Sequence, residues 1–249
     1  MKSLYLPLVL LGSTAAITVI AEEGHHWSYK GETGPAHWAA LEKEFETCGV
    51  GKHQSPIDIH KSGLKAADLP QIAFDYKPSP LKIVDNGHTV QVNYAPGSAI
   101  TVGDARYELQ QFHFHHPSEE KVDGKAFAMV AHLVHKDAAG KLAVVAVPIV
   151  KGAANPMVDT LWKYVPREKA HEEAVAGVSI NAADLLPAKR AYYTFEGSLT
   201  TPPCSEGVRW FVLKSPATLS AGEIAAFAKL YPMNARPVQP LNDRVVEAS

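Results

Sequence analysis

Short runs of alternating apolar and polar residues recur along most of the chain. Each run is rich in β-branched or aromatic side chains and is bounded by Gly, Pro, Asn or Asp. Alternation with a period of two residues between such turn signals predicts half-buried β-strands. The predicted strands are Ile72–Tyr76, Leu81–Asp85, Thr89–Tyr94, Ala99–Val102, Tyr107–His115, Phe127–His135 and Leu142–Val150.

Helical periodicity is rare and short by comparison. It covers Pro35–Phe45, Pro156–Tyr164 and Ala221–Leu230, and Ser220 is a candidate N-cap for the last of these. The Asn86-Gly87 pair between two predicted strands is a strong signal for a tight hairpin turn. With no repeat or linker dividing the chain, the pattern predicts one mainly β domain with short peripheral helices, of the α+β class.

The N-terminal segment has the layout of a secretory signal peptide. Lys2 gives a positive start, residues 4–11 are almost wholly apolar, and small residues lead to Ala21 before two glutamates. We therefore expect a signal peptide over residues 1–21 and the mature domain over residues 22–249. The alternative is a permanent membrane anchor, but the apolar run is barely long enough and contains a proline and a glycine.

Export would place the mature domain in the periplasm or otherwise outside the cytosol, where disulfides persist. The chain has two cysteines, Cys48 and Cys204. An even pair in an exported protein most often forms a disulfide, and two buried free thiols are the alternative.

The formal net charge of −2 at pH 7 is close to neutral. It gives no reason to expect nucleic acid or an anionic membrane surface as a partner. No membrane span is expected once the signal peptide is removed, and a homodimer remains an option that the sequence leaves open.

Histidines are placed unevenly, with a concentration in two predicted strands. Side chains two residues apart on a strand share a face, so His113 and His115 point one way. In the strand that ends at His135, the same alternation puts Val130, His132 and Val134 on one face. If the two strands are neighbours, His132 completes a site of three nitrogens with one open position for water, as in catalytic zinc sites. Alternatively, these are strand histidines that meet backbone groups or solvent.

Ordered motifs from His25 to Arg244 resemble the α-class carbonic anhydrases. They are Trp27–Tyr29, Gly34–Trp38, Gln54–Ile59, Asn86–His88, Gln111–His115, His132–His135, Ser198–Glu206 and Pro240–Asn242. The resemblance implies a large, central, twisted and mostly antiparallel sheet. It also implies reversible hydration of carbon dioxide to bicarbonate and a proton. In that family Zn²⁺ is held by three histidines, here His113, His115 and His132, and zinc-bound hydroxide attacks carbon dioxide.

The resemblance assigns catalytic roles to three further residues. Thr200 would donate its hydroxyl hydrogen to Glu119 and thereby orient the attacking oxygen. His88 would carry the released proton to buffer, because an imidazole titrates near neutral pH. On sequence alone Glu119 belongs to a charged turn, Thr200 is a loop threonine, and His88 is a solvent-facing side chain beside a turn.

Carbon dioxide has no charge and no net dipole, so its pocket should have an apolar wall. The residues that match the family's pocket positions are Val134, Val144, Leu199, Thr201, Val208 and Trp210. The apolar members would serve equally well as core. Gln111 matches a residue that supports the first zinc ligand by accepting a hydrogen bond from it. The Ser55-Pro56 and Pro202-Pro203 bonds resemble cis peptide bonds of the family.

One position departs from the family pattern. Relatives usually carry a glutamate two residues before the third histidine ligand, and this chain has Val130 there. Valine cannot accept a hydrogen bond, so we expect a backbone carbonyl or a water to fix the tautomer of His132. We also expect zinc to be held less tightly than in relatives.

The sequence is also compatible with two alternative functions. One is a catalytically silent exported binding or scaffold protein on the same fold, although such relatives usually lack a zinc histidine. The other is a zinc-dependent esterase, which would use the same attacking oxygen but would need a wider pocket with groups that orient its substrate.

Overall fold

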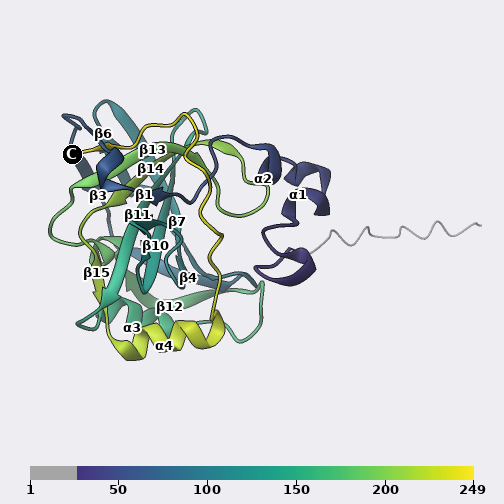
Figure 1. Ribbon diagram of the computed structural model, residues 1–249. Helices are drawn as coiled ribbons and strands as arrows, with labels where there is room; N and C mark the ends of the chain where they lie inside the picture. The colour runs from purple at the N-terminus through teal and green to yellow at the C-terminus, as the bar shows by residue number, and fades with distance from the viewer. Residues whose placement is uncertain (1–26) are drawn as a thin grey trace, which may run out of the picture.

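The computed structural model describes residues 27–249, so the predicted signal peptide over residues 1–21 lies outside the described residues. A 13-stranded sheet dominates the molecule (Figure 1). Its main path runs in the order β12 (Glu172–Ile180), β4 (Ser79–Asp85), β5 (Val90–Asn93), β7 (Ala105–His115), β10 (Met129–Lys136), β11 (Leu142–Lys151), β14 (Glu206–Leu213), β13 (Tyr192–Ser198), β16 (Glu247–Ala248) and β2 (Lys65–Ala66).

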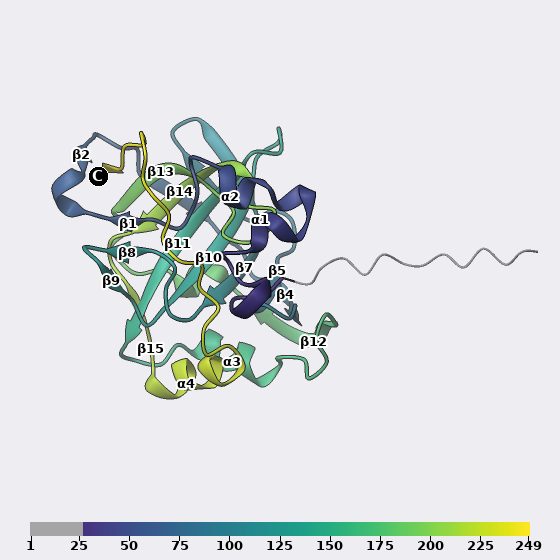
Figure 2. The ribbon, with the colours of Figure 1, turned by 45° about the vertical axis from the view of Figure 1, so that its right-hand side comes forward.

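Three further strands extend this sheet away from the main path. β15 (Ala217–Leu219) pairs with β11, and β6 (Ala99–Val102) pairs with both β7 and β3 (Ile72–Asp75). Antiparallel pairing predominates, and the parallel pairs are β11–β14, β11–β15 and β16–β2. A separate small sheet joins β1 (Asp58–Ile59), β8 (Lys121–Val122) and β9 (Lys125–Ala126), as Figure 2 shows at one side of the molecule. The predicted fold class is therefore confirmed.

All seven predicted strands occur within a few residues of their expected limits. The Asn86-Gly87 hairpin is also present, joining the antiparallel strands β4 and β5. Strands β12, β13 and β14 were not among the predicted runs. β12 is largely exposed and lacks regular alternation, and β13 is buried at nearly every position, so neither shows the period of two that marks a half-buried strand.

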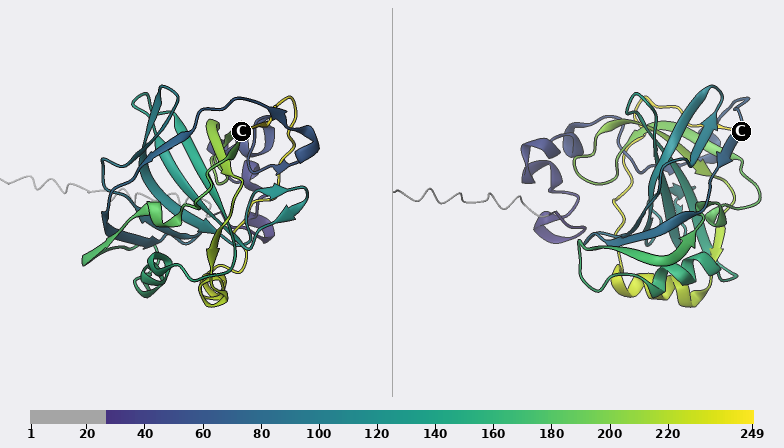
Figure 3. Two further views of the ribbon diagram at one scale, coloured as in Figure 1. Left: turned by 90° about the vertical axis from the view of Figure 1, so that its left-hand side faces the viewer. Right: turned by 180° about the vertical axis from the view of Figure 1, so that it is seen from behind.

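Helices are short and lie at the periphery. Two of them, α3 (Pro156–Lys163) and α4 (Ala221–Leu230), lie side by side along one edge of the fold (Figure 3). Ser220 caps α4 as the sequence predicted, and it does so in a capping box with Glu223. The helix expected over Pro35–Phe45 is wrong as one element. It is divided into α1 (Trp38–Leu41) and a 3₁₀ turn η2 (Lys43–Phe45), because Glu42 between them has an extended backbone.

The remaining short elements are α2 (Thr47–Val50) and the 3₁₀ turns η1 (Gly31–Thr33), η3 (Lys61–Gly63) and η4 (Ala182–Leu185). Cys48 of α2 is joined to Cys204 by a disulfide that spans 156 residues of sequence, which confirms the predicted pair. Closing a loop of that length stabilises the fold by about 5 kcal/mol in the chain-entropy treatment. The bond ties the N-terminal helical segment to the loop that contains Thr200.

The cis peptide bonds expected at Ser55-Pro56 and Pro202-Pro203 are both present, and a third occurs at His116-Pro117. No helix in the described part of the chain is long and apolar enough to cross a membrane.

The central strands bury different residues on their two faces. One face of β7, β10 and β11 contributes Phe112, Phe114, Leu133 and Val145 to the large core, which also receives α3 and α4. The opposite face carries the histidines and a second apolar group, here called the site-side cluster. Its buried members are Ile57, Ile59, Val130, Val144, Ala146, Tyr193, Phe195, Val208, Trp210, Val212 and Val246.

His135 lies on the core face of β10 and is fully buried. Its Nε2 is hydrogen-bonded to the Tyr76 hydroxyl across 2.7 Å. Burial lowers the pKa of His135 from 6.5 to about 3. Below pH 6.5 the unfolded chain therefore binds a proton that the folded chain does not, and the free energy of unfolding falls as the pH drops toward 3.

Replacing His135 with Gln should remove this contribution to acid sensitivity. Both proteins are compared without zinc. Between pH 6 and pH 4, the unfolding free energy of the variant should fall by about 1.4 kcal/mol less per pH unit than that of the parent protein. Urea unfolding at several pH values measures the two slopes. His60→Gln, at an exposed histidine, is the control and should keep the parent slope. Equal slopes for His135→Gln and the parent would contradict the assignment.

Candidate metal centre

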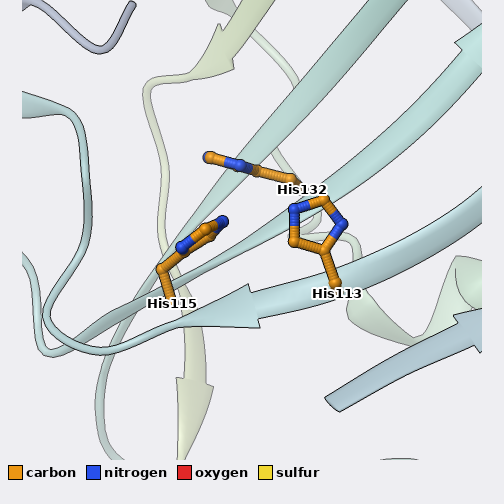
Figure 4. A group of neighbouring side chains, drawn as sticks. All are labelled: His113, His115 and His132. Atoms are coloured by element: carbon orange, nitrogen blue, oxygen red, sulfur yellow. The ribbon is translucent and has the colours of Figure 1, made fainter. Parts of the chain in front are cut away.

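Three histidine rings converge from two neighbouring strands (Figure 4). His113 and His115 come from β7, and His132 comes from β10, where it pairs directly with His113 in the antiparallel register. One ring nitrogen from each histidine lies within 4.8 Å of the other two. The condition set from the sequence, that the two strands are neighbours, is therefore met, and His132 completes the site of three nitrogens as expected.

The second nitrogen of each ring is held by an oxygen acceptor. His113 Nδ1 lies 2.8 Å from Gln111 Oε1, and His115 Nδ1 lies 2.7 Å from the backbone oxygen of Asn234. His132 Nε2 lies 2.9 Å from Glu120 Oε1. Because each of these nitrogens must donate a hydrogen, the lone pairs left for a ligand are on Nε2, Nε2 and Nδ1 respectively.

These residues fit a zinc ion. His115 Nε2 is buried and has no hydrogen-bond partner within the protein, so a group outside the chain is needed to satisfy it. Three imidazole nitrogens that leave one position free are the ligand set of a catalytic zinc site. The Gln111 contact with His113 is the one that the resemblance implied.

Burial keeps two of the three ligands neutral. It lowers the pKa of His113 to about 3 and that of His115 well below its ordinary value, and the other rings of the site add to both shifts. Burial also acts to lower the pKa of His132, but the Glu120 and Glu119 carboxylates outweigh it and raise that pKa. Of the three ligands, His132 is therefore the one whose surroundings favour the protonated, positively charged ring.

Glu119 lies against the same nitrogens. Its Oε2 is 3.5 Å from His115 Nε2 and 3.8 Å from His132 Nδ1, and its Oε1 accepts a hydrogen bond from the Arg236 backbone N–H at 2.8 Å. Burial raises the pKa of Glu119 to about 7. Opposing contributions come from His132, from the Arg236 amide and from a side-chain hydrogen bond with Thr200. The two residues that the resemblance pairs are thus neighbours beside the histidines.

Of the two expectations for Val130, its position on the strand is confirmed and the acceptor expected for His132 is wrong. By alternation it shares the face of His132, and it is buried in the site-side cluster. The expectation that a backbone carbonyl or a water replaces the missing glutamate is wrong, because the acceptor is the Glu120 carboxylate. On sequence alone Glu120, like its neighbour Glu119, belongs to a charged turn, and no residue pattern indicates its approach to His132. The predicted weakening of zinc binding loses its premise.

Asn234 is a second residue that the sequence gave no reason to select. It is fully buried after α4, and its backbone oxygen accepts from His115. Its side-chain amide donates to the backbone oxygens of His88 and Phe114, each at 3.0 Å. Asn234 therefore joins a metal ligand to the turn that carries His88.

His88 occupies the third turn position after Asp85. The Asn86 side chain accepts hydrogen bonds from the His88 and Thr89 amides, and Gly87 has a positive φ of 88° that this turn requires. The His88 ring stacks on the Trp27 ring, with centroids 3.6 Å apart and planes 7° apart.

The residues predicted for the substrate wall lie together beside the histidines. Val134 on β10 pairs with Val144 on β11, which pairs with Trp210 on β14. Val144, Val208 and Trp210 are buried members of the site-side cluster, and Val134 and Leu199 pack against it. The Trp210 ring meets the His132 ring edge to face, with centroids 5.0 Å apart. Thr201, in the loop after Leu199, accepts the Cys204 amide through its backbone oxygen.

The chain is similar in sequence to carbonic anhydrases over most of its length. The sequence profile of the eukaryotic-type carbonic anhydrases matches residues 33–249. A carbonic anhydrase of Pectobacterium carotovorum is 43% identical over 240 residues, which cover 96% of this chain and 97% of the relative. A carbonic anhydrase of Nostoc sp. strain PCC 7120 is 43% identical over 224 residues, covering 89% of this chain and 85% of the relative.

A solved structure agrees with these relatives. The α-carbonic anhydrase of Thermovibrio ammonificans, in complex with the inhibitor sulfanilamide, superimposes with a TM-score of 0.85 at 42% identity. The match covers 89% of this chain and 98% of that one. The chain therefore belongs to the α-class, or eukaryotic-type, carbonic anhydrases, which are lyases that hydrate carbon dioxide, and His113, His115 and His132 form its zinc site.

Proposed function

We propose that this carbonic anhydrase works through Thr200 and Glu119 as the orienting pair, an apolar wall for carbon dioxide, and His88 as the proton carrier. The observation that carries the proposal is the convergence of three histidine nitrogens within 4.8 Å, with Glu119 beside them. Zn²⁺ held there supplies Lewis-acid activation of water for attack on carbon dioxide. The remaining steps belong to the side chains of the protein.

The first step is orientation of the attacking oxygen. Thr200 lies beside Glu119 and acts to lower the pKa of that carboxyl. Because an ionised carboxylate only accepts hydrogen bonds, the Thr200 hydroxyl would be the donor to it. The Thr200 oxygen then has only lone pairs to offer the site. It accepts a hydrogen from the nucleophile and holds the nucleophile's remaining lone pair toward the substrate. The Arg236 amide fixes the carboxylate from behind.

The second step is placement of carbon dioxide. A nonpolar gas gains nothing from hydrogen-bonding groups, and water held at such a surface is easily displaced. The wall of Val134, Val144, Leu199, Val208 and Trp210, with Thr201 at its loop edge, offers this kind of surface next to His132. The same wall lacks charged groups that would orient an ester, which favours carbon dioxide hydration over the esterase alternative.

The third step is removal of the proton. His88 takes it on a ring nitrogen through solvent and passes it to buffer. Two contacts support this role: the His88 ring is stacked on Trp27, and the bond from Asn234 to the His88 backbone oxygen links its turn to the residue that accepts from the His115 ligand.

The disulfide and the bacterial relatives indicate an extracytoplasmic protein. We propose that residues 1–21 are the signal peptide that exports it, to the periplasm or to the outside, and that residues 22–249 form the mature domain. Homodimer formation stays a prediction.

Stopped-flow hydration of carbon dioxide tests the proposed function directly. Purified protein should be active, should lose activity when a chelator removes zinc, and should regain it when zinc is added back. If the protein were instead a catalytically silent scaffold, it would show no hydration activity even with one zinc ion bound per chain.

His88→Ala should lower kcat by about 10²-fold, the low end for a positioned proton-transfer group, while kcat/KM for hydration stays close to the parent value. The split arises because proton removal follows the attack on carbon dioxide. Added imidazole should restore kcat. His171→Ala, at an exposed histidine, is the control and should change neither constant. If His88→Ala left kcat unchanged, another group would carry the proton.

A further inference from the structure

Glu120 carries a buried carboxylate that the steps above do not use. Glu120 and His132 are each only 1% exposed, and Glu120 Oε1 lies 2.9 Å from His132 Nε2. Burying a carboxylate costs free energy unless the group is paired and hydrogen-bonded, and the contact with His132 offsets that cost. It also decides which nitrogen of His132 faces the other two histidines.

The backbone on both sides of Glu120 is fixed. The Ser118 hydroxyl donates to the Glu120 backbone oxygen at 2.8 Å and accepts the Phe127 amide at 2.8 Å, which ties the turn to the chain just before β10. The next residue, Lys121, opens β8 and pairs with Asp58 of β1. The side chain is therefore presented to His132 by a turn that is anchored at both ends.

The strand position that could have supplied this acceptor is apolar. Val130 is two residues before His132 on the same face, is fully buried, and packs with Ile57, Ile59 and the rest of the site-side cluster. His132 consequently has no acceptor on its own strand, and Glu120 is the only protein acceptor for its Nε2 among the described residues.

We propose that Glu120 is the positioning residue of the third zinc ligand. Its carboxylate accepts the Nε2–H of His132, fixes that tautomer and ring orientation, and so leaves the Nδ1 lone pair directed at the metal. The carboxylate is supplied from the turn before β8 because the strand position is occupied by Val130. This role concerns the zinc site itself and is independent of the proposed proton path through His88.

The test is zinc affinity, measured by competition with a chromophoric chelator on the full protein. Glu120→Leu removes the acceptor and should weaken zinc binding by about 10- to 100-fold. Glu120→Gln keeps an acceptor oxygen without the charge and should weaken it by a smaller factor. An unchanged zinc dissociation constant in both variants would overturn the proposal.

A second measurement locates the ring hydrogen of His132 and can be made first on the parent protein. In the zinc-loaded parent protein, long-range ¹H–¹⁵N correlation of the histidine rings should find the hydrogen of His132 on Nε2 in a strongly downfield signal, with Nδ1 bound to metal. Glu120→Leu should move that signal upfield and leave those of His113 and His115 in place. A hydrogen found on Nδ1 of His132 would overturn the proposal even if no Glu120 variant folds.

Two further variants separate positioning from simple stabilisation. Glu223→Gln changes another buried carboxylate, which belongs to the capping box of α4, and it should lower the melting temperature without changing the zinc dissociation constant. Val130→Glu adds a second carboxylate near a ring nitrogen that is already satisfied, so it should not tighten zinc binding. Tighter binding by Val130→Glu would mean that His132 lacks an effective acceptor in the parent protein, contrary to the proposal.

Failure of the Glu120 role and failure of the His88 role can be told apart. Loss of zinc affinity in Glu120→Leu with a parent-like proton-transfer rate at full zinc loading would support the role of Glu120 and leave His88 unaffected. A kcat defect in His88→Ala at parent zinc affinity would show the converse.

Discussion

The antiparallel register of β7 against β10 is the constraint on which the rest of the site depends. It sets His132 opposite His113 and Ala131 opposite Phe114, so that the ligands share one face and the large core receives the other. A slip of one residue would turn the whole set of one strand to the wrong face. The ligands of the metal are thus located by the same burial of Phe112, Phe114 and Leu133 that holds the sheet together.

Register alone does not orient an imidazole ring, and the acceptors that do so come from three separate parts of the chain. Gln111 is on the ligand strand itself, Glu120 is in the turn before β8, and Asn234 follows α4. Each acceptor removes one of the two tautomers of its histidine, which leaves three lone pairs that converge without any rearrangement. Strand pairing therefore sets the positions of the rings, and their directions are set by one acceptor on strand β7 and by two from segments outside the ligand strands.

This division explains what could be predicted from the sequence. Alternation in β7 and β10 is visible in the residue pattern, so the shared face of the three histidines could be inferred from it, and the motif resemblance then identified the family. Gln111 could also be found, because it lies two residues from His113 on one strand. Asn234 lies 119 residues from His115 and contributes a backbone oxygen, which any residue type could supply, so no residue pattern marks it. β12 and β13 were missed because neither alternates.

Glu120 shows why a departure from a family pattern is hard to interpret one position at a time. A valine at position 130, where relatives carry glutamate, suggests that the ligand His132 lacks a hydrogen-bond acceptor. That interpretation considers only the strand as a source of the carboxylate. His132 requires only an acceptor oxygen that lies along the N–H direction of its Nε2. A side chain at position 130 of the same strand or one in the turn before β8 can supply that oxygen. With Glu120 in the turn, an acid at position 130 would be a third buried carboxylate beside Glu119 and Glu120, and burial of like charges is unfavourable. The valine and the glutamate are therefore two parts of one solution: the turn supplies the acceptor, and the strand is free to extend the apolar surface that packs against Ile57 and Ile59.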